Sequence, residues 1–181
     1  MKRDGCSNAP ASLLRKPAMD YQTATSRKLH DEHRDSLALL GRLERGVLGV
    51  PAGGLPDAGF AALAKQVARS VEGEVDRHFR FEEDELFHRL AAAGEHDLVD
   101  LLQEEHRSIR ASAAELLPML QAASAGGLDA AQFAALKPAA LEFAERLESH
   151  IHKEDAALLP AIDAILDAAV DQQLALACAE P

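Results

Sequence analysis

A short pattern of histidines and glutamates occurs twice in this chain. DEHR at residues 31–34 recurs as EEHR at residues 104–107, and HFRFEE from His78 recurs loosely as HIHKED from His150. The two histidine offsets, 33 to 106 and 78 to 150, are 73 and 72 residues. Repeats indicate copies of one supersecondary unit that pack together. The sequence therefore predicts two helical hairpins, each with a lone His on its first helix and a His-x-x-x-Glu pair on its second, with a pseudo-twofold site between them.

Composition, and the Pro and Gly residues between the expected segments, favour helices throughout both hairpins. Ala, Leu and Val dominate the hydrophobic 48% of the chain, aromatic residues make up 4%, and Trp is absent, which favours an all-α protein. Short connections at Pro and Gly make neighbouring helices antiparallel, so we expect an up-and-down antiparallel four-helix bundle with a short C-terminal helix. The expected helices run from Ser26 to about Arg45, from about Asp57 to Ala93, from His96 to Ser124 and, after a cap at Asp129, to Pro160, with the short helix over residues 161–180.

The chain has the length of one domain with its own core. We assign residues 23–181 to the bundle and residues 1–22, which mix Gly, Ser, Asn, Pro and charges without periodicity, to a flexible N-terminal arm. The two cysteines, Cys6 and Cys178, have no spacing typical of a metal-thiolate site or a disulfide framework.

The net charge excludes one class of partner. Thirty acidic residues against nineteen basic ones give a formal charge of −11, which repels nucleic acid and anionic membranes. No apolar run typical of a signal peptide follows the first residues, and no stretch approaches the length of a membrane span. We therefore expect a cytoplasmic protein.

One face of each expected helix is apolar except at one or two polar positions. A core-facing stripe repeats about every 3.6 residues, so polar residues in phase with it are predicted to be buried. Each of the four long helices places one histidine in its stripe, and the second and fourth add a glutamate four residues later on the same face. These in-phase residues are His33, His78, Glu82, His106, His150 and Glu154.

A shared metal centre explains why these groups would be buried together. A lone His on an apolar stripe is more often a hydrogen-bonded core residue than a ligand. Burying several imidazoles and two carboxylates is costly unless each finds a partner, however, and the matched offsets favour ligands. Nitrogen and oxygen donors suit a divalent ion such as iron, whereas calcium and magnesium prefer oxygen and structural zinc prefers thiolates. We predict two metals, each held by two His and both bridged by Glu82 and Glu154, with positions open for a small ligand.

Several other polar residues are predicted to lie outside this centre. His30, one turn before His33, is either an outer partner of the site or a surface residue, and Glu85 is at most an outer partner. Those expected to be solvated are His88, His96, His152, Glu83 and Asp84.

Other site chemistries lack the residues that they need. A ferritin-like di-iron code requires two Glu-x-x-His copies, and this string occurs once, from Glu85 to His88. The chain has no GxSxG motif and no phosphate-binding glycine loop, and its cysteines are near the ends. Serine, thiol and phosphate chemistry are therefore not expected.

The motifs resemble those of the hemerythrin-like, or HHE cation-binding, domains over residues 25–165. They are EHR with His33, HFRFEE with His78 and Glu82, EEHR with His106, and HIHKED with His150 and Glu154. The resemblance implies an up-and-down four-helix bundle with a non-haem di-iron centre bridged by carboxylates and an oxo or hydroxo group. Members of this family bind or sense oxygen, respond to nitric oxide, repair iron-sulfur clusters or sense iron.

Two positions depart from the oxygen carriers of that family. The carriers have a further His one turn after the third-helix ligand, where this chain has Arg110. Arg110 either leaves a metal position open near His106, or leans outward to solvent or an acidic neighbour. The carriers' fourth-helix carboxylate is an Asp that corresponds to Asp155, although Glu154 is better phased on a straight helix. We expect a di-iron protein that binds or senses oxygen or nitric oxide, and keep as the alternative an enzyme-like role in iron-sulfur cluster repair or in nitric oxide or peroxide turnover.

Overall fold

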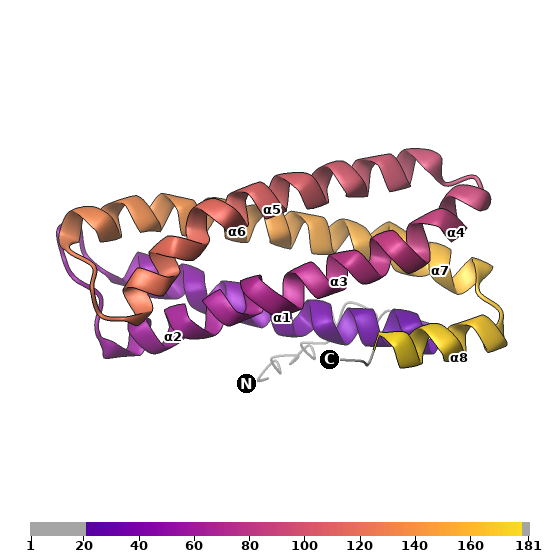
Figure 1. Cartoon of the computed structure of the whole chain (residues 1–181), viewed down its shortest axis with the longest axis horizontal. Helices are drawn as coiled ribbons and strands as arrows, with labels where there is room; N and C mark the ends of the chain where they lie inside the picture. The colour runs from indigo at the N-terminus through magenta and orange to yellow at the C-terminus, as the bar shows by residue number, and fades with distance from the viewer. Residues whose placement is uncertain (1–20, 179–181) are drawn as a thin grey trace, which may run out of the picture.

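The computed structural model describes residues 21–178, and every regular element in this range is helical (Figure 1). The predicted all-α class is therefore confirmed. The helices form five continuous segments, in which η denotes a π-helical stretch. They are α1 (Ala24–Gly49); α2 (Ala58–Arg69), η1 (Ser70–Val75), α3 (Asp76–Phe81), η2 (Glu82–Leu86) and α4 (Phe87–Ala92); α5 (His96–Ser124); α6 (Ala130–Lys153), η3 (Glu154–Leu158) and α7 (Leu159–Ile165); and α8 (Ala168–Ala177).

The four longest segments pack side by side into an elongated bundle (Figure 1). α1 contacts α2 and α6, and α5 contacts the same two helices, so the contacts close around a common core. α8 lies against α1 at the end of the bundle where α7 also approaches it.

The apolar core is divided into two clusters, and polar side chains lie between them. On α1, Leu29 belongs to one cluster and Leu40 to the other, with buried His33 between them. The division falls at His106 on α5 and at Glu82 on the second segment. A polar layer therefore crosses the bundle between two apolar clusters.

Several helix boundaries differ from those predicted. α1 begins at Ala24 rather than Ser26, because the Thr23 hydroxyl caps it by accepting a hydrogen bond from the Ser26 amide. The fourth segment continues past Pro160 to Ile165. Pro160 stands just after η3, where hydrogen bonding changes from the π to the α pattern, so its missing N–H is accommodated there. The short C-terminal helix starts only after a cap at Asp167.

Two residues that the sequence analysis assigned to the N-terminal arm, Tyr21 and Gln22, form hydrogen bonds with the bundle. Tyr21 is buried, and its hydroxyl donates a hydrogen bond of 2.9 Å to the main-chain oxygen of Asp155. The Gln22 amide donates to Asp163. Tyr21 and Gln22 therefore contact the fourth segment, and residues 1–20, including Cys6, lie outside the described residues.

No helix between residues 21 and 178 combines the length and the apolar character needed to cross a bilayer. The cytoplasmic location stays a prediction.

Candidate metal centre

The six predicted site residues come together in the polar layer. The four histidines lie on α1, α3, α5 and α6, one on each side of the core, and the two glutamates are the first residues of η2 and η3. Glu82, Glu154 and His106 have no exposed surface, His33 and His150 are almost fully buried, and the side chain of His78 is 10% exposed. The burial of these six side chains agrees with their position in the apolar stripes.

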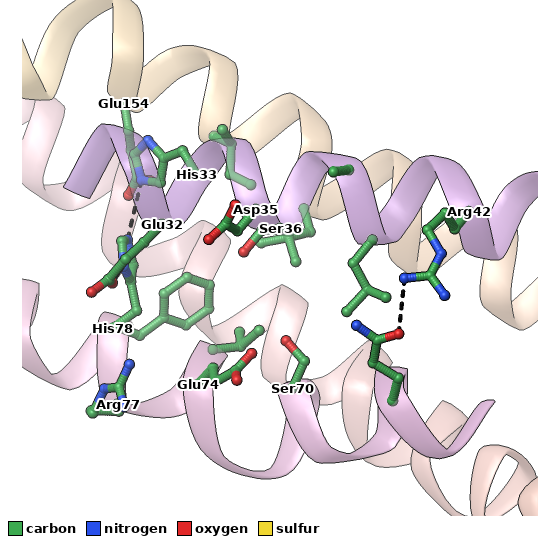
Figure 2. A pocket seen from close by; sticks show the side chains of 17 residues that line it. Glu32, His33, Asp35, Ser36, Arg42, Ser70, Glu74, Arg77, His78 and Glu154 are labelled. Carbon is green, nitrogen blue, oxygen red and sulfur yellow. Dashed lines mark hydrogen bonds and ion pairs between the residues drawn. The ribbon is translucent and has the colours of Figure 1, made fainter. Parts of the chain in front are cut away.

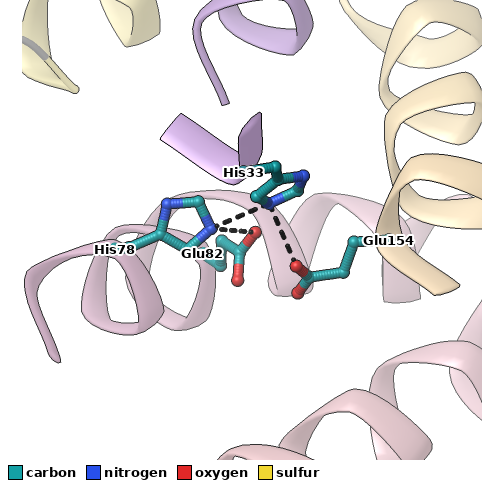
Figure 3. Close-up of side chains that lie close together, drawn as sticks. All are labelled: His33, His78, Glu82 and Glu154. Carbon is teal, nitrogen blue, oxygen red and sulfur yellow. Dashed lines mark hydrogen bonds and ion pairs between the residues drawn. The ribbon is translucent and has the colours of Figure 1, made fainter. Parts of the chain in front are cut away.

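These residues form two overlapping groups of possible metal ligands. One ligand atom from each of His33, His78, Glu82 and Glu154 lies within 4.8 Å of the others (Figure 3). The second group contains His106, His150 and the same two glutamates. Both groups therefore share their carboxylates and differ in their histidine pair.

Each glutamate directs one oxygen to each histidine pair. The Oε1 of Glu82 lies 3.3 Å from Nε2 of His78, and its Oε2 lies 3.3 Å from Nε2 of His106. Glu154 repeats this arrangement with the opposite partners: its Oε2 is 3.1 Å from Nε2 of His33, and its Oε1 is 2.8 Å from Nε2 of His150. The pseudo-twofold symmetry expected from the sequence repeat is therefore present in these contacts.

The outer nitrogen of every histidine in the centre faces a further carboxylate. The Nδ1–carboxylate pairs are His33 with Asp155 at 2.8 Å, His78 with Glu32 at 2.8 Å, His106 with Glu83 at 2.7 Å, and His150 with Glu105 at 3.0 Å. A carboxylate acceptor at Nδ1 makes that nitrogen the donor and leaves the Nε2 lone pair directed into the centre. Carboxylates commonly orient metal-binding histidines in this way.

The inner atoms leave a set of electron pairs that a cation would satisfy. The Nε2 atoms of His33 and His78 are 3.2 Å apart, and those of His106 and His150 are 3.1 Å apart. All four carboxylate oxygens of Glu82 and Glu154 are buried, and none has a hydrogen-bond partner among the described residues. Their contacts with Nε2 are close but lack hydrogen-bond geometry. Because buried charges of this kind are costly unless paired, the arrangement fits divalent cations between the histidine pairs.

Protons compete with a metal for the same atoms. Burial alone would lower the pKa of His33, but the hydrogen bond to Asp155 and the nearby negative charge of Glu154 outweigh it and raise the pKa to about 9. Burial likewise opposes protonation of His106, whose pKa is raised to about 9 by Glu154 and Glu82. A bound metal requires neutral imidazoles, so its binding displaces these protons.

The residues expected at the surface divide into two kinds. His88, His96, His152 and Asp84 are exposed as predicted. Glu83 was wrongly assigned to solvent, because it accepts hydrogen bonds from His106 and Arg110. Glu85 forms an ion pair with Arg89 and belongs to neither ligand group.

Asp155 and His30 occupy the outer side of the centre. The Asp155 carboxylate faces Nδ1 of His33, whereas Glu154 faces the inner nitrogens, so the geometry assigns the inner position to Glu154. His30 lies 3.1 Å from the same Asp155 oxygen and packs against the ring of Tyr21. It is therefore an outer partner and does not reach the inner atoms.

Arg110 points away from the inner atoms. Its guanidinium donates to Glu83 at 2.6 Å and to Asp76 at 3.1 Å, and it lies 5.3 Å from the centre of the Phe79 ring. Of the two alternatives left open by the sequence, pairing with acidic neighbours is the one observed. Beside His106, the ring of Phe79 stacks on the imidazole at 3.8 Å and 8°.

The outer carboxylates were missed although the repeat contains them. Glu32 and Glu105 precede the lone histidine in both copies, and Glu83 and Asp155 follow the paired glutamate in both copies. None of the four lies in phase with the core stripe. Only their matched positions in the repeat could have indicated a shared role.

The all-helical fold and the two buried His and Glu groups define a class of protein, the helical bundles that hold metal in their core. The family model described as "Hemerythrin HHE cation binding domain" matches residues 24–162. The chain belongs to the hemerythrin family. A search of curated proteins finds no significant match.

Proposed function

We propose that the chain binds two iron ions in this centre. His33 and His78 hold one ion, His106 and His150 hold the other, and Glu82 and Glu154 bridge them. The observation that carries this proposal is the placement of four fully buried carboxylate oxygens, one from each glutamate toward each histidine pair, with no hydrogen-bond partner among the described residues. Imidazole and carboxylate donors suit iron, and an oxo or hydroxo bridge is part of the proposed centre.

The up-and-down antiparallel order of four long helices is part of the same proposal. It is supported by the short connections between the segments and by the contacts of α1 and α5 with both α2 and α6. This order lets one histidine from each long segment reach the core at the same level.

We further propose that the centre binds or senses a small diatomic ligand, oxygen or nitric oxide. A ferrous pair supplies the open coordination positions and the electrons for such a ligand. The chain contributes the histidines and glutamates that hold the pair, the carboxylates that orient the imidazoles, and apolar clusters that limit the access of water.

A pocket of about 490 Å³ supports access of the ligand from one side (Figure 2). It lies between α1 and the α2–α3 segment, and His33, His78 and Glu154 line one part of it. His106 and His150 do not line this pocket, and the rings of Phe79 and Phe87 contact His106. The ligand would therefore reach the iron at His33 and His78.

The size of this pocket favours a second candidate function. A volume of about 490 Å³ exceeds the needs of a diatomic molecule and leaves space for a larger reactant. The alternative is therefore turnover, either of nitric oxide or peroxide or in the repair of iron-sulfur clusters.

Addition of ligand to the anaerobically reduced, iron-loaded protein separates the two functions. Binding predicts a visible absorption band that appears with oxygen or nitric oxide and disappears when the gas is removed. Turnover predicts continued consumption of the gas or of peroxide at a catalytic ratio. A Glu82→Gln, Glu154→Gln protein, which should lose the iron pair, is the control, and an identical response from it would overturn the proposed site.

A further inference from the structure

The two histidine pairs share the same two glutamates but differ in the charged groups that surround their outer carboxylates. Glu83, which accepts from His106, also accepts two guanidinium hydrogen bonds from Arg110, of 2.6 and 3.2 Å. Glu105, which accepts from His150, forms an ion pair with Lys153. Each carboxylate behind this histidine pair is thus neutralised by a cation.

The carboxylates behind the other pair have weaker partners. Asp155 contacts His30 in addition to His33, and Glu32 accepts from the Cys178 thiol at 3.7 Å in addition to His78. No arginine or lysine among residues 21–178 forms an ion pair with either carboxylate, although Arg77 and Lys28 act on Glu32 from a greater distance. These two carboxylates therefore keep more of their negative charge.

This difference in charge changes how strongly each imidazole donates electrons. A carboxylate that accepts the Nδ1–H of a ligating histidine increases the basicity of the imidazole, and a more basic ligand stabilises the ferric state. A cation paired with that carboxylate reduces this effect and adds positive charge near the metal. The His106 and His150 position should therefore favour ferrous iron relative to the His33 and His78 position.

The difference in burial between the two histidine pairs also favours ferric iron at His33 and His78. The side chains of His106 and His150 have no exposed surface, and Phe79 stacks on the His106 ring. His78 is 10% exposed and lines the pocket of Figure 2. Because water and polar groups stabilise the more highly charged ion, the pocket side favours ferric iron.

We propose that Arg110 and Lys153 make the two halves of the centre electronically unequal, so that the iron at His33 and His78 is oxidised first and the iron at His106 and His150 keeps its electron longer. This inference rests on the proposed di-iron function. It assigns to Arg110, which lies outside the ligand set, the role of a positioning residue that sets the order of oxidation.

An anaerobic redox titration of the iron-loaded protein with ferricyanide tests the proposal. Ferricyanide accepts one electron from each iron in turn, and we expect two separate steps with a mixed-valent electron paramagnetic resonance signal at half oxidation. Arg110→Gln and Lys153→Gln should each lower the potential of the second step more than that of the first. We expect about a tenfold loss in the stability of the mixed-valent state per substitution, which is about 59 mV for a one-electron couple.

Matched variants separate this role from a structural one. Arg107→Gln removes an exposed arginine of the same helix that pairs with Glu104, and it should leave both potentials unchanged. Arg110→Lys should restore most of the separation, because it keeps the charge.

The proposal is overturned if the parent protein is oxidised in a single step, if Arg110→Gln moves mainly the first step, or if both Gln variants behave like Arg107→Gln. Fewer than two irons in the parent protein would instead contradict the proposed function. Lys153→Gln provides an independent test if Arg110→Gln does not fold.

Discussion

At the scale of single residues, the two nitrogens of each imidazole in the centre have different partners. Nε2 faces the shared glutamates, and Nδ1 donates to an outer carboxylate from a different helix. Each outer carboxylate is the chain neighbour of a residue whose side chain points inward. Glu83 and Asp155 thus face the outer nitrogen of a histidine whose inner nitrogen faces the preceding glutamate. This explains why the outer carboxylates recur with the sequence repeat.

The outer carboxylates should contribute to metal affinity. Glu83→Gln replaces the charged acceptor of His106 by a neutral one, so we expect the affinity for ferrous iron to fall by about 10–100-fold. Competition with a chelator under anaerobic conditions measures this change. Glu85→Gln, two residues away and outside the ligand groups, is the matched control, and equal affinities in the two variants would contradict the role of Glu83.

His150 and His152, which are two residues apart, should differ completely in their contribution to iron binding. His150→Ala removes a buried ligand and should cost at least one iron per chain, whereas His152→Ala removes an exposed side chain and should change neither iron content nor spectrum. Metal analysis of both purified variants makes the comparison. If both variants lost iron equally, the assignment of the inward face of α6 would be wrong.

Helical phase predicted the burial of the six inward side chains but not their outer partners. The stripe identifies His33, His106 and the other inward residues because burial of a polar side chain violates an otherwise apolar pattern. Glu83 breaks no such pattern, and its contact with His106 depends on how α5 packs against η2. Side chains with long-range partners of this kind need the three-dimensional structure.

At the scale of elements, π-helical stretches begin at the same place in both repeats. η2 starts at Glu82 and η3 at Glu154, so each inward glutamate begins a π-helical stretch. π-Bulges are frequent at functional sites and add a residue to the turn. The sequence predicted two continuous helices here, because a periodicity of 3.6 residues does not reveal a local change in hydrogen bonding.

The start of α1 depends on residues far away in the chain. Asp163 accepts hydrogen bonds from the Thr23 amide and hydroxyl, and Asp171 accepts from the amides of Ala24 and Thr25. Asp163 is 140 residues from Thr23. Sequence alone therefore located α1 but misplaced its first residue.

These two caps predict a dependence of stability on pH. Burial opposes ionisation of Asp163 and Asp171, but the backbone hydrogen bonds outweigh it and lower the pKa of both carboxyls in the folded state. Their contribution is therefore complete above the unfolded pKa of about 3.9 and is lost as the pH falls through the lower, folded value.

Replacement of either aspartate by Ala should reduce the free energy of unfolding by about 1–2 kcal/mol at neutral pH. The difference from the parent protein should shrink as both carboxylates become protonated. Urea denaturation at neutral and acidic pH measures it, and Asp100→Ala, which alters an exposed aspartate, is the control. A constant difference across the pH range would contradict the capping role.

At the scale of the whole molecule, the polar layer separates two apolar clusters and contains at least one side chain from each long segment. Without a cation, the layer depends on protons shared between imidazoles and carboxylates. With a cation, all four segments are joined at one level. Metal should therefore stabilise the fold as a whole rather than one helix.

Removal of metal should lower the melting temperature. A free ion at 100 times its dissociation constant stabilises the folded state by about 2.7 kcal/mol for each site, so the transition should rise as ferrous iron is added to the metal-free protein. Calorimetry under anaerobic conditions measures this rise. The Glu82→Gln, Glu154→Gln protein should show little dependence on iron, and an equal rise in both proteins would indicate binding elsewhere.

The number of metal ions per chain tests the central claim most directly. Native mass spectrometry of the protein loaded with ferrous iron under anaerobic conditions gives this number for the folded chain. Two histidine pairs that share two glutamates predict the mass of the chain plus two irons, as expected of a dinuclear centre in a helical bundle. A folded chain that takes up a single iron, or one zinc and no iron from a medium rich in iron, would contradict the account.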